Sequence, residues 1–500
     1  MSGRSAELLR LADAVLHPGF EGTTAPEWLR RRLAEGLGGV ALFSRNIVNP
    51  DQLRKLVGTI RADNPDAAVA IDEEGGDVTR LEASTGSSRP GNLALGTVDD
   101  LALTEAVARD IGRDLAAVGI TLDYAPDADV NSNPDNPAIG VRSFGATPDL
   151  VARHTAAWVR GLQSTGVAAC AKHFPGQGDT SIDTHHDLPT VGGSAEEIAL
   201  AALPPFRAAI EAGVRAVMTG HLLVPGYDPS APATMSRRIL IDLLRGELGF
   251  DGLIITDGIE MKAVTDRFGL AGASVRAITA GADAICVGGG YADEATVELL
   301  RTALVDAVTA GELPVQRLAD AARRVGALAT WTAASTAEIS DGEPSGMTAA
   351  RRAVRVVARP DSVDLLPLSG PAHVVELATT MHLAIDRHTP WGLAEPLMTL
   401  LPGTTSARLH PDDLADRVRL DKATLEPAAG RPLVVVVRDA HRHAWMSEIL
   451  DHLLAARPDT IVVELGVPGS APLGATYVTT HGAARVCTEA AAEILTGQGD

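Results

Sequence analysis

The chain has 500 residues, 45% of them hydrophobic and only 3% aromatic, and a chain of this length is expected to form two domains. Its 43 Lys and Arg residues against 64 Asp and Glu residues give a net charge of −21 at pH 7. This acidic excess argues against nucleic acid or an anionic membrane as a partner and favours a soluble protein. The three cysteines, Cys170, Cys286 and Cys487, are widely spaced and lie in or beside apolar runs, so we expect buried thiols and neither a disulfide framework nor a metal site.

The N-terminal stretch from Met1 to Leu16 is amphipathic, has mixed charge and lacks the hydrophobic core of a signal peptide. No later apolar run approaches the length of a membrane-spanning helix. The sequence therefore predicts a cytoplasmic location.

From about residue 38 to residue 330, short β-rich runs alternate with helical stretches, such as those at 104–118 and 196–211. Ser194 and Glu197 have the spacing of a capping box at the start of one of these helices. This alternation predicts parallel strands, in either a doubly wound sheet or a (β/α)8 barrel. The seven runs found are 40–43, 67–71, 120–124, 167–170, 215–218, 253–255 and 282–287.

Polar residues follow many of these runs, and this favours the barrel. A barrel gathers all its strand ends on one face, so the polar groups would converge on one pocket, whereas an open sheet would spread them out. A (β/α)8 barrel needs eight strands, so with seven runs we expect either an irregular barrel or one further strand. The polar groups in question begin at Asp72, Asp123, Lys172, His221 and Asp257.

Residues 331–345 are small, polar and acidic, as in a linker. After this segment, the sequence again alternates short β-rich runs with helical stretches. We therefore predict a barrel domain over 1–335, a linker over 336–349 and a smaller α/β sandwich domain over 350–500. No residue of the C-terminal domain is predicted to be catalytic.

The loop from Lys172 to Pro189 concentrates three His, three Asp and a Lys after a buried strand. Within it, Asp183 lies two residues before His185, so its carboxylate can fix the imidazole tautomer and raise its basicity. Such a His can donate a proton to a leaving group and later accept one. The alternative is a surface loop in which the two side chains merely satisfy each other.

Asp257 lies at the tip of a buried strand, where a carboxylate can act as a nucleophile or stabilise a cation. The alternative is that Asp257 caps the following helix, and Glu260, three residues on, fits that alternative.

Five further residues have the types that bind sugar hydroxyl groups by bidentate hydrogen bonds, and the cations among them would also keep nearby carboxylates ionised. For Arg142 and Lys172 the alternative is a structural ion pair near a strand end. The five are Asp72, Arg142, Lys172, His173 and His221.

No metal or organic cofactor is expected. The loop has metal-ligand residue types, but no HExxH or paired-cysteine pattern appears, and adjacent His residues rarely bind one ion. Gly288 to Gly290 resemble a phosphate-binding turn, although glycines at such a place more often form a plain turn. The ligand types are at His173, Asp179, Asp183, His185, His186 and Asp187.

Several motifs, in order over roughly residues 38–265, are similar to those of glycoside hydrolase family 3 β-N-acetylglucosaminidases. The main one includes Lys172-His173-Phe174-Pro175-Gly176, Gly178-Asp179-Thr180, Asp183, His185 and Leu188-Pro189. The others are Asp72-x-Glu74-Gly75-Gly76, Ala125-Pro126-x-x-Asp129-Val130-Asn131, Arg142-Ser143-Phe144, Met218-Thr219-x-His221 and the segment from Leu244 to Gly252.

This resemblance implies a (β/α)8 barrel enzyme that removes terminal β-linked N-acetylglucosamine with retention. It implies that Asp257 is the nucleophile and that His185, coupled to Asp183, is the acid/base. The five hydroxyl-binding candidates match positions that hold the sugar. The sequence departs from the family pattern at Gln177, Asp77 and Gly258, where His, Arg and an acidic residue are more common. Asp77 in particular removes a positive charge near the sugar site.

The predicted function is therefore a retaining exo-β-N-acetylglucosaminidase acting on short chitin or peptidoglycan fragments. Because a His acid/base is neutral after losing its proton, it would not repel phosphate, so a phosphorylase is one alternative and a broad β-glucosidase another. Alternatives of other classes are an inactive sugar-binding sensor and a metallohydrolase. The expected partner is a small carbohydrate, and a monomer is favoured.

Overall fold

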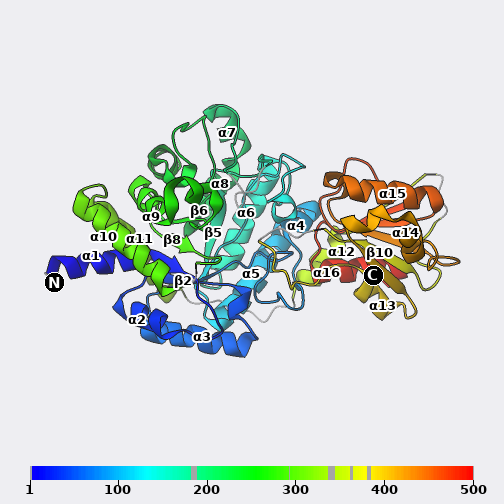
Figure 1. Cartoon of the computed structure of the whole chain (residues 1–500), viewed down its shortest axis with the longest axis horizontal. Helices are drawn as coiled ribbons and strands as arrows, with labels where there is room; N and C mark the ends of the chain where they lie inside the picture. Colours follow the sequence, from blue (N-terminus) through cyan, green and yellow to red (C-terminus); the bar gives the residue numbers. More distant parts are fainter. Residues whose placement is uncertain are drawn as a thin grey trace. The chain divides into compact units, whose positions relative to one another are not determined.

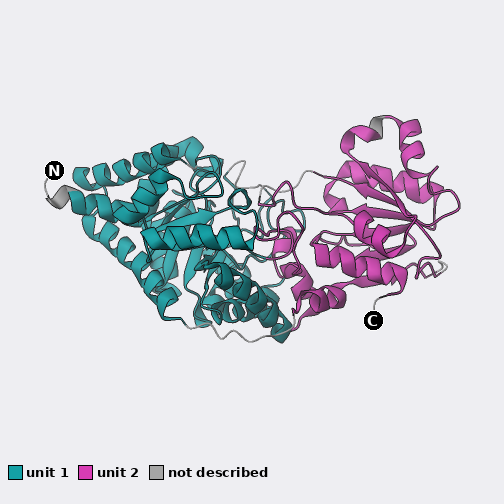
Figure 2. Ribbon diagram, turned by 90° about the horizontal axis from the view of Figure 1, so that it is seen from below, with its two compact units in different colours: residues 1–74, 101–139, 145–343 teal, residues 75–100, 140–144, 344–500 magenta. Residues whose placement is uncertain are grey.

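The structure is a computed structural model, and it describes residues 3–181, 188–291, 293–335, 344–360, 364–379 and 384–498 (Figure 1). The chain divides into two compact units (Figure 2). Unit 1 comprises Met1–Glu74, Leu101–Ile139 and Gly145–Glu343, and unit 2 comprises Gly75–Asp100, Gly140–Phe144 and Pro344–Asp500. Two short segments from the first third of the chain thus group with the C-terminal residues. The domain boundaries 1–335, 336–349 and 350–500 stay a prediction.

Unit 1 is a (β/α)8 barrel built on parallel strands, as expected. Six strands pair in sequence order from β2 to β7, and β8 pairs in parallel with β1. A bridge between Ile255 and Ala284 joins β7 to β8, and the Gly38 amide donates to the Asp13 carbonyl where β1 and β2 begin, at 3.0 Å. The strands are β1 (Leu16–Pro18), β2 (Gly39–Leu42), β3 (Ala68–Ile71), β4 (Leu122–Asp123), β5 (Ala168–Phe174), β6 (Ala216–Thr219), β7 (Leu253–Thr256) and β8 (Ile285–Val287).

The eighth strand is β1, which the sequence pattern did not indicate. It has only three residues, and two of them, His17 and Pro18, are uncommon in buried strands. His17 is fully buried, and burial lowers the pKa of its imidazole to about 4, so the ring is neutral. A neutral imidazole can occupy a position that the sequence pattern reserves for apolar residues.

Helices surround this barrel because each carries one apolar stripe. In α5, for example, Leu103, Val107, Ile111 and Leu115 recur every four residues and are buried. The capping box of α7 is confirmed: the Ser194 hydroxyl accepts from the Glu197 amide at 3.2 Å, and the Glu197 carboxylate accepts from the Ser194 amide at 2.7 Å.

The helical segments of unit 1 are α1 (Gly3–Ala14), α2 (Glu27–Glu35), η1 (Ser44–Asn46), α3 (Pro50–Asp63), α5 (Leu101–Val118), α6 (Pro148–Gln163), α7 (Ala195–Ala201), α8 (Pro204–Glu211), η3 (Ala233–Met235), η4 (Arg238–Glu247), α9 (Lys262–Ala280), α10 (Glu294–Ala310) and α11 (Val315–Ala334).

Small side chains line much of the barrel core. Buried alanines from four strands, together with Ala284 just before β8, pack there with two cysteine side chains. Cys170, Cys286 and, in unit 2, Cys487 are all free and buried, so the prediction of buried thiols is confirmed. The alanines are Ala41, Ala70, Ala168, Ala216 and Ala284.

Unit 2 is an α/β sandwich, which confirms the fold class predicted for the C-terminal part. Its six-stranded sheet has the order β11-β10-β12-β13-β14-β9, with β9 antiparallel and the others parallel. Valines that alternate along β12 point to apolar clusters on both faces of the sheet. The strands are β9 (Arg355–Ala358), β10 (His373–Leu377), β11 (Thr405–Leu409), β12 (Leu433–Val437), β13 (Ile461–Glu464) and β14 (Thr476–Thr479).

The helical segments of unit 2 are α4 (Asn92–Val98), η2 (Gly140–Arg142), α12 (Gly346–Ala353), α13 (Ala394–Leu400), η5 (Pro411–Ala415), α14 (Arg417–Thr424), η6 (Ala440–Arg442), α15 (Ala444–Ala456) and α16 (Arg485–Thr496). Within the part of the chain that the structure describes, no helix has both the length and the apolar character needed to cross a bilayer.

Candidate active site

Four of the predicted site residues lie at the carboxyl ends of strands in unit 1. Asp72 directly follows β3, Lys172 and His173 lie near the end of β5, and Asp257 directly follows β7. His221 follows β6 by two residues. Because the carboxyl ends of barrel strands open on one face, these side chains belong to the same face of unit 1.

Lys172 is the cation of a buried ionic group. Its ammonium contacts Asp72 Oδ1 and Glu74 Oε1, both at 2.7 Å. The Lys172 and Glu74 side chains are 3% and 2% exposed, whereas the Asp72 side chain is 21% exposed. Glu74 therefore neutralises Lys172 on the buried side, and Asp72 is the partner with surface left for a ligand.

A further carboxyl group, that of Asp123, lies close to Lys172 and Asp72. Asp123, the last residue of β4, is fully buried and accepts a hydrogen bond from the Glu73 amide at 2.9 Å. Burial raises the pKa of Asp123 well above its usual value, and the carboxylates of Glu73 and Asp72 raise it further, against the opposing effects of the Glu73 amide and Lys172. Burial is the largest of these effects, so the protonated form of Asp123 is favoured in the folded protein.

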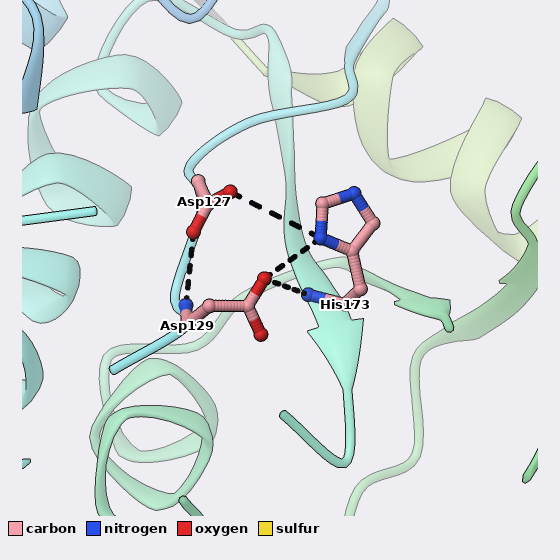
Figure 3. A group of neighbouring side chains, drawn as sticks. All are labelled: Asp127, Asp129 and His173. Carbon is pink, nitrogen blue, oxygen red and sulfur yellow. Dashed lines mark hydrogen bonds and ion pairs between the residues drawn. The ribbon is translucent and has the colours of Figure 1, made fainter. Parts of the chain in front are cut away.

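His173 is held by two aspartates from the loop that follows β4 (Figure 3). Its Nδ1 lies 2.8 Å from Asp129 Oδ2 and 3.9 Å from Asp127 Oδ2. Both aspartates are fully buried and His173 is 6% exposed. The Asp129 carboxylate also accepts from the Gln177 amide at 2.6 Å, so it contacts both the end of β5 and the loop that follows.

Asp257 is partly buried, and its backbone is well anchored. Its amide donates to the Thr219 carbonyl at 3.1 Å, and its Oδ1 accepts from the Gly258 amide at 2.7 Å. Fully buried His221 lies alongside, with Nε2 3.0 Å from the Gly258 carbonyl and Nδ1 2.9 Å from Thr234 Oγ1. His221 thus supports the backbone next to Asp257; a direct contact between His221 and a sugar stays a prediction.

The capping alternative for Asp257 is wrong. Helix α9 begins at Lys262, and the residue at its N-cap position is Met261. Glu260 instead accepts a hydrogen bond from the Gly288 amide at 2.9 Å, and a Cβ atom on Gly289 would lie 2.9 Å from the same Glu260 oxygen. The glycines after β8 therefore allow close approach of Glu260, so that a protein carboxylate, and no phosphate, uses the Gly288 amide.

Three other predicted residues are not brought into this group by the described structure. Asp183 and His185 lie outside the described residues, as do His186 and Asp187. Arg142 ends the helical turn η2, which belongs to unit 2, and the Asn92 side-chain amide donates to its carbonyl at 2.6 Å. The roles of Asp183, His185 and Arg142 stay predictions.

Sequence reasoning assigned no role to several residues that the structure brings into the site. Glu74 and Asp129 belonged to recognised motifs, and Asp123 stood in a polar run at a strand end, so the positions carried a signal. No pattern in the sequence indicated that Glu74 pairs with Lys172 or that Asp129 pairs with His173. The partners in each pair are separated by 40 residues or more in the sequence.

Among the described residues, one group has the composition of a metal site: Asp127, Asp129 and His173, whose ligand atoms lie within 4.8 Å of one another. The distance of 2.8 Å between His173 Nδ1 and Asp129 Oδ2 is that of a hydrogen bond. Both Asp129 oxygens already accept from N–H groups. These potential metal-ligand atoms of Asp129 and His173 thus already take part in hydrogen bonds within the protein.

The departures at Asp77 and Gly258 have structural reasons. Asp77 is buried in unit 2, where it pairs with Arg438 at 2.6 Å and accepts from the Ala483 amide at 2.8 Å. Its charge is therefore neutralised by Arg438. At Gly258 a Cβ atom would lie 3.2 Å from one oxygen of Glu260, so an acidic residue there would bring two carboxylates together.

Comparison with known proteins agrees with this architecture. Residues 23–328 match the family described as the glycosyl hydrolase family 3 N-terminal domain. β-Hexosaminidase A of Pseudoalteromonas piscicida is 31% identical over 430 residues, which cover 79% of this chain and 71% of that protein.

Among solved structures, a glycoside hydrolase family 3 β-N-acetylglucosaminidase from Paenibacillus sp. str. FPU-7 has a TM-score of 0.87 and 32% identity. That match covers 99% of this chain and 97% of the Paenibacillus chain. A β-glucoside phosphorylase covers 100% of this chain and 96% of its own, with a TM-score of 0.77, but at 18% identity it shows the shared fold alone.

The family match spans most of unit 1, and the structural match extends over both units. The chain therefore belongs to glycosyl hydrolase family 3, and it is a glycoside hydrolase of the β-N-acetylglucosaminidase type within that family.

Proposed function

We propose that the chain is a retaining exo-β-N-acetylglucosaminidase in which Asp257 is the nucleophile. The observation that carries this proposal is the position of Asp257: a partly buried carboxylate at the carboxyl end of β7, on the same barrel face as the group of Lys172 and Asp72. The names of the relatives, β-hexosaminidase and β-N-acetylglucosaminidase, support the substrate class.

In the proposed first step, Asp257 attacks the anomeric carbon while the leaving oxygen takes a proton from His185, which Asp183 orients. The bond between the anomeric carbon and the leaving oxygen breaks as the bond to Asp257 forms. In the second step His185 accepts a proton from water, which attacks the same carbon and releases Asp257. The two inversions together give retention.

The remaining predicted residues would hold the sugar. Asp72 would accept hydrogen bonds from hydroxyl groups, and the Lys172 ammonium, 2.7 Å from Asp72, would hold that carboxylate in position. His173, His221 and Arg142 are proposed as further contacts on the strength of the family resemblance.

Short chitin or peptidoglycan fragments are the proposed substrates, in chitin degradation or peptidoglycan recycling. A monomer in the cytoplasm that binds no nucleic acid is proposed on the same terms. Phosphorolysis is not favoured, because the relatives of higher identity are named as hexosaminidases, whereas the phosphorylase shares the fold alone.

The test is release of nitrophenol from the β-N-acetylglucosaminide and from the β-glucoside, each with and without phosphate. Wild type is compared with Asp257→Ala and His185→Ala, and proton NMR of the first product gives the anomer. We expect preference for the acetylated sugar, no dependence on phosphate, β-anomer first, and loss of turnover in Asp257→Ala. A wild type that binds the sugar without cleaving either substrate would favour the sensor instead, and sugar 1-phosphate as product would favour the phosphorylase.

A further inference from the structure

The loop after β4 carries a carboxylate, that of Asp129, to which the proposed reaction gives no role. Asp129 is fully buried and accepts three hydrogen bonds, all from the segment that ends β5 and begins the next loop. The donors are the backbone amide of His173 at 3.3 Å, its Nδ1 at 2.8 Å, and the amide of Gln177 at 2.6 Å.

The surroundings of the imidazole decide its tautomer. Asp129 Oδ2 at 2.8 Å and Asp127 Oδ2 at 3.9 Å both face Nδ1, and ionised carboxylates only accept hydrogen bonds. Nδ1 therefore carries a proton, and Figure 3 shows Nε2 directed away from both aspartates. Nε2 thus lies on the opposite side of the ring from the two carboxylates.

The same carboxylate also fixes the start of the loop after β5. Besides the bond from Gln177, the Asn136 side-chain amide donates to the Gln177 carbonyl at 2.8 Å, and Asn133 Nδ2 donates to the Thr180 carbonyl at 3.2 Å. Gly178 lies so close to this platform that a Cβ atom would come 1.7 Å from the Val130 carbonyl oxygen. The chain is thus held in register up to Thr180, three residues before Asp183.

We propose that Asp129 is a positioning residue of the site: it orients His173 with Nε2 toward the sugar and holds the start of the loop that carries the proposed acid/base pair. This proposal rests on the proposed glycosidase function. Replacement of Asp129 by Asn keeps the size but offers one acceptor oxygen where the structure has donors on both carboxylate oxygens. The amide NH2 would then face an N–H group, so one of the two contacts must break.

The test compares Asp129→Asn with the matched variant Asp127→Asn. Asp127 is equally buried, but its nearer oxygen is 3.9 Å from Nδ1, and its Oδ1 accepts from the Asp129 amide at 3.0 Å, a bond that an Asn oxygen can also accept. We expect Asp129→Asn to raise KM for the N-acetylglucosaminide by about 10- to 100-fold, with a smaller fall in kcat, and Asp127→Asn to change KM by less than about threefold. Equal effects in the two variants would overturn the proposal.

A second measurement does not depend on enzymatic activity, and its wild-type arm does not depend on the folding of any Asp129 variant. In protein labelled with 15N at histidine, the His173 signal is assigned by its loss in His173→Gln, and the 15N shifts report which ring nitrogen carries a proton. We expect a protonated Nδ1 in wild type that is lost in Asp129→Asn and kept in Asp127→Asn. A wild type with an unprotonated Nδ1 would overturn the role of Asp129 even if the chain proves to be an active glycosidase. A wild type with no turnover but a protonated Nδ1 would instead overturn the glycosidase function alone.

Discussion

The two ends of the barrel in unit 1 both contain buried ion pairs, but in opposite proportions. At the amino end, fully buried Asp283 pairs with Arg245 and Arg317, each at 2.5 Å, and also accepts from the Ile254 amide at 2.9 Å. Two guanidinium groups thus pair with this single buried carboxylate.

At the carboxyl end the single ammonium of Lys172 serves Asp72 and Glu74, so carboxylates outnumber the cation. Asp257 on that face is only partly buried. A buried carboxylate with every oxygen engaged stabilises the fold, whereas carboxylates in excess that keep some exposed surface can act on a ligand. The ratio of carboxylates to cations, together with the exposure of the carboxylates, thus distinguishes a structural cluster from a functional one.

Asp257→Asn is expected to give the largest difference between an effect on catalysis and an effect on stability. It should lower kcat for the nitrophenyl N-acetylglucosaminide by at least about 10³-fold, because the proposed covalent step loses its nucleophile. The free energy of unfolding should stay the same or rise, since a carboxylate kept partly exposed for catalysis does not stabilise the fold. Urea unfolding and steady-state kinetics measure the two effects. Retention of more than a tenth of wild-type kcat would remove Asp257 from the mechanism.

Asp283→Asn should give the opposite result. Loss of the charge that compensates Arg245 and Arg317 is expected to lower the free energy of unfolding by about 3–5 kcal/mol. Values of kcat and KM measured below the unfolding midpoint should match those of wild type. Asp251→Asn is the matched control: its side chain is 93% exposed and pairs with Arg324, so it should cost no more than about 1 kcal/mol. A fall in kcat in stably folded Asp283→Asn would contradict the division between the two ends.

Lys172→Met is expected to lower both the catalytic activity and the free energy of unfolding. Without the ammonium, Asp72 and Glu74 lie close together as like charges, so one of them should take up a proton and the pKa of the pair should rise. We expect kcat/KM at neutral pH to fall at least about tenfold and the pH–rate profile to move, while the free energy of unfolding falls by about 3 kcal/mol. A variant whose pH profile matches wild type would show that Lys172 is a purely structural partner.

Features that depend on one strand and the residues after it were predictable from the sequence. The polar residues after β3, β5 and β7 were found because a buried strand gives a short apolar run and a barrel gathers the strand ends. The same reasoning failed for β1, where three residues that include His17 and Pro18 give no apolar run.

Pairings between distant segments were not predictable. Nothing in the sequence connects Glu74 to Lys172 or Asp283 to Arg317, because such pairs depend on which strand ends the closed barrel brings together. The grouping of residues 75–100 and 140–144 with the C-terminal unit was likewise hidden, since it depends on contacts such as that between Asp77 and Arg438. Arg142 belongs to that unit for the same reason.

The smallest effect, and the one that most sharpens the comparison, concerns Asp123 at the carboxyl end. Its pKa is raised well above the usual value, chiefly by burial, so the folded state binds a proton that the unfolded state releases above about pH 4. Its contribution to the free energy of unfolding therefore falls as the pH rises from there toward its folded pKa. Asp123→Asn keeps an oxygen that can accept from the Glu73 amide but cannot ionise, so the variant should become more stable than wild type by about 1.4 kcal/mol per pH unit within that window.

Urea unfolding of both proteins at several values between pH 5 and pH 8 measures this difference, which should grow with pH and leave kcat/KM nearly unchanged. A stability difference that stays constant between pH 5 and pH 8 would show instead that Asp123 is ionised in the folded protein, because an Asp with a lowered pKa changes the free energy of unfolding only below about pH 4. In that case the carboxyl end would hold one more fixed charge, and the excess of carboxylates over cations there would be larger than the comparison of the two ends now implies.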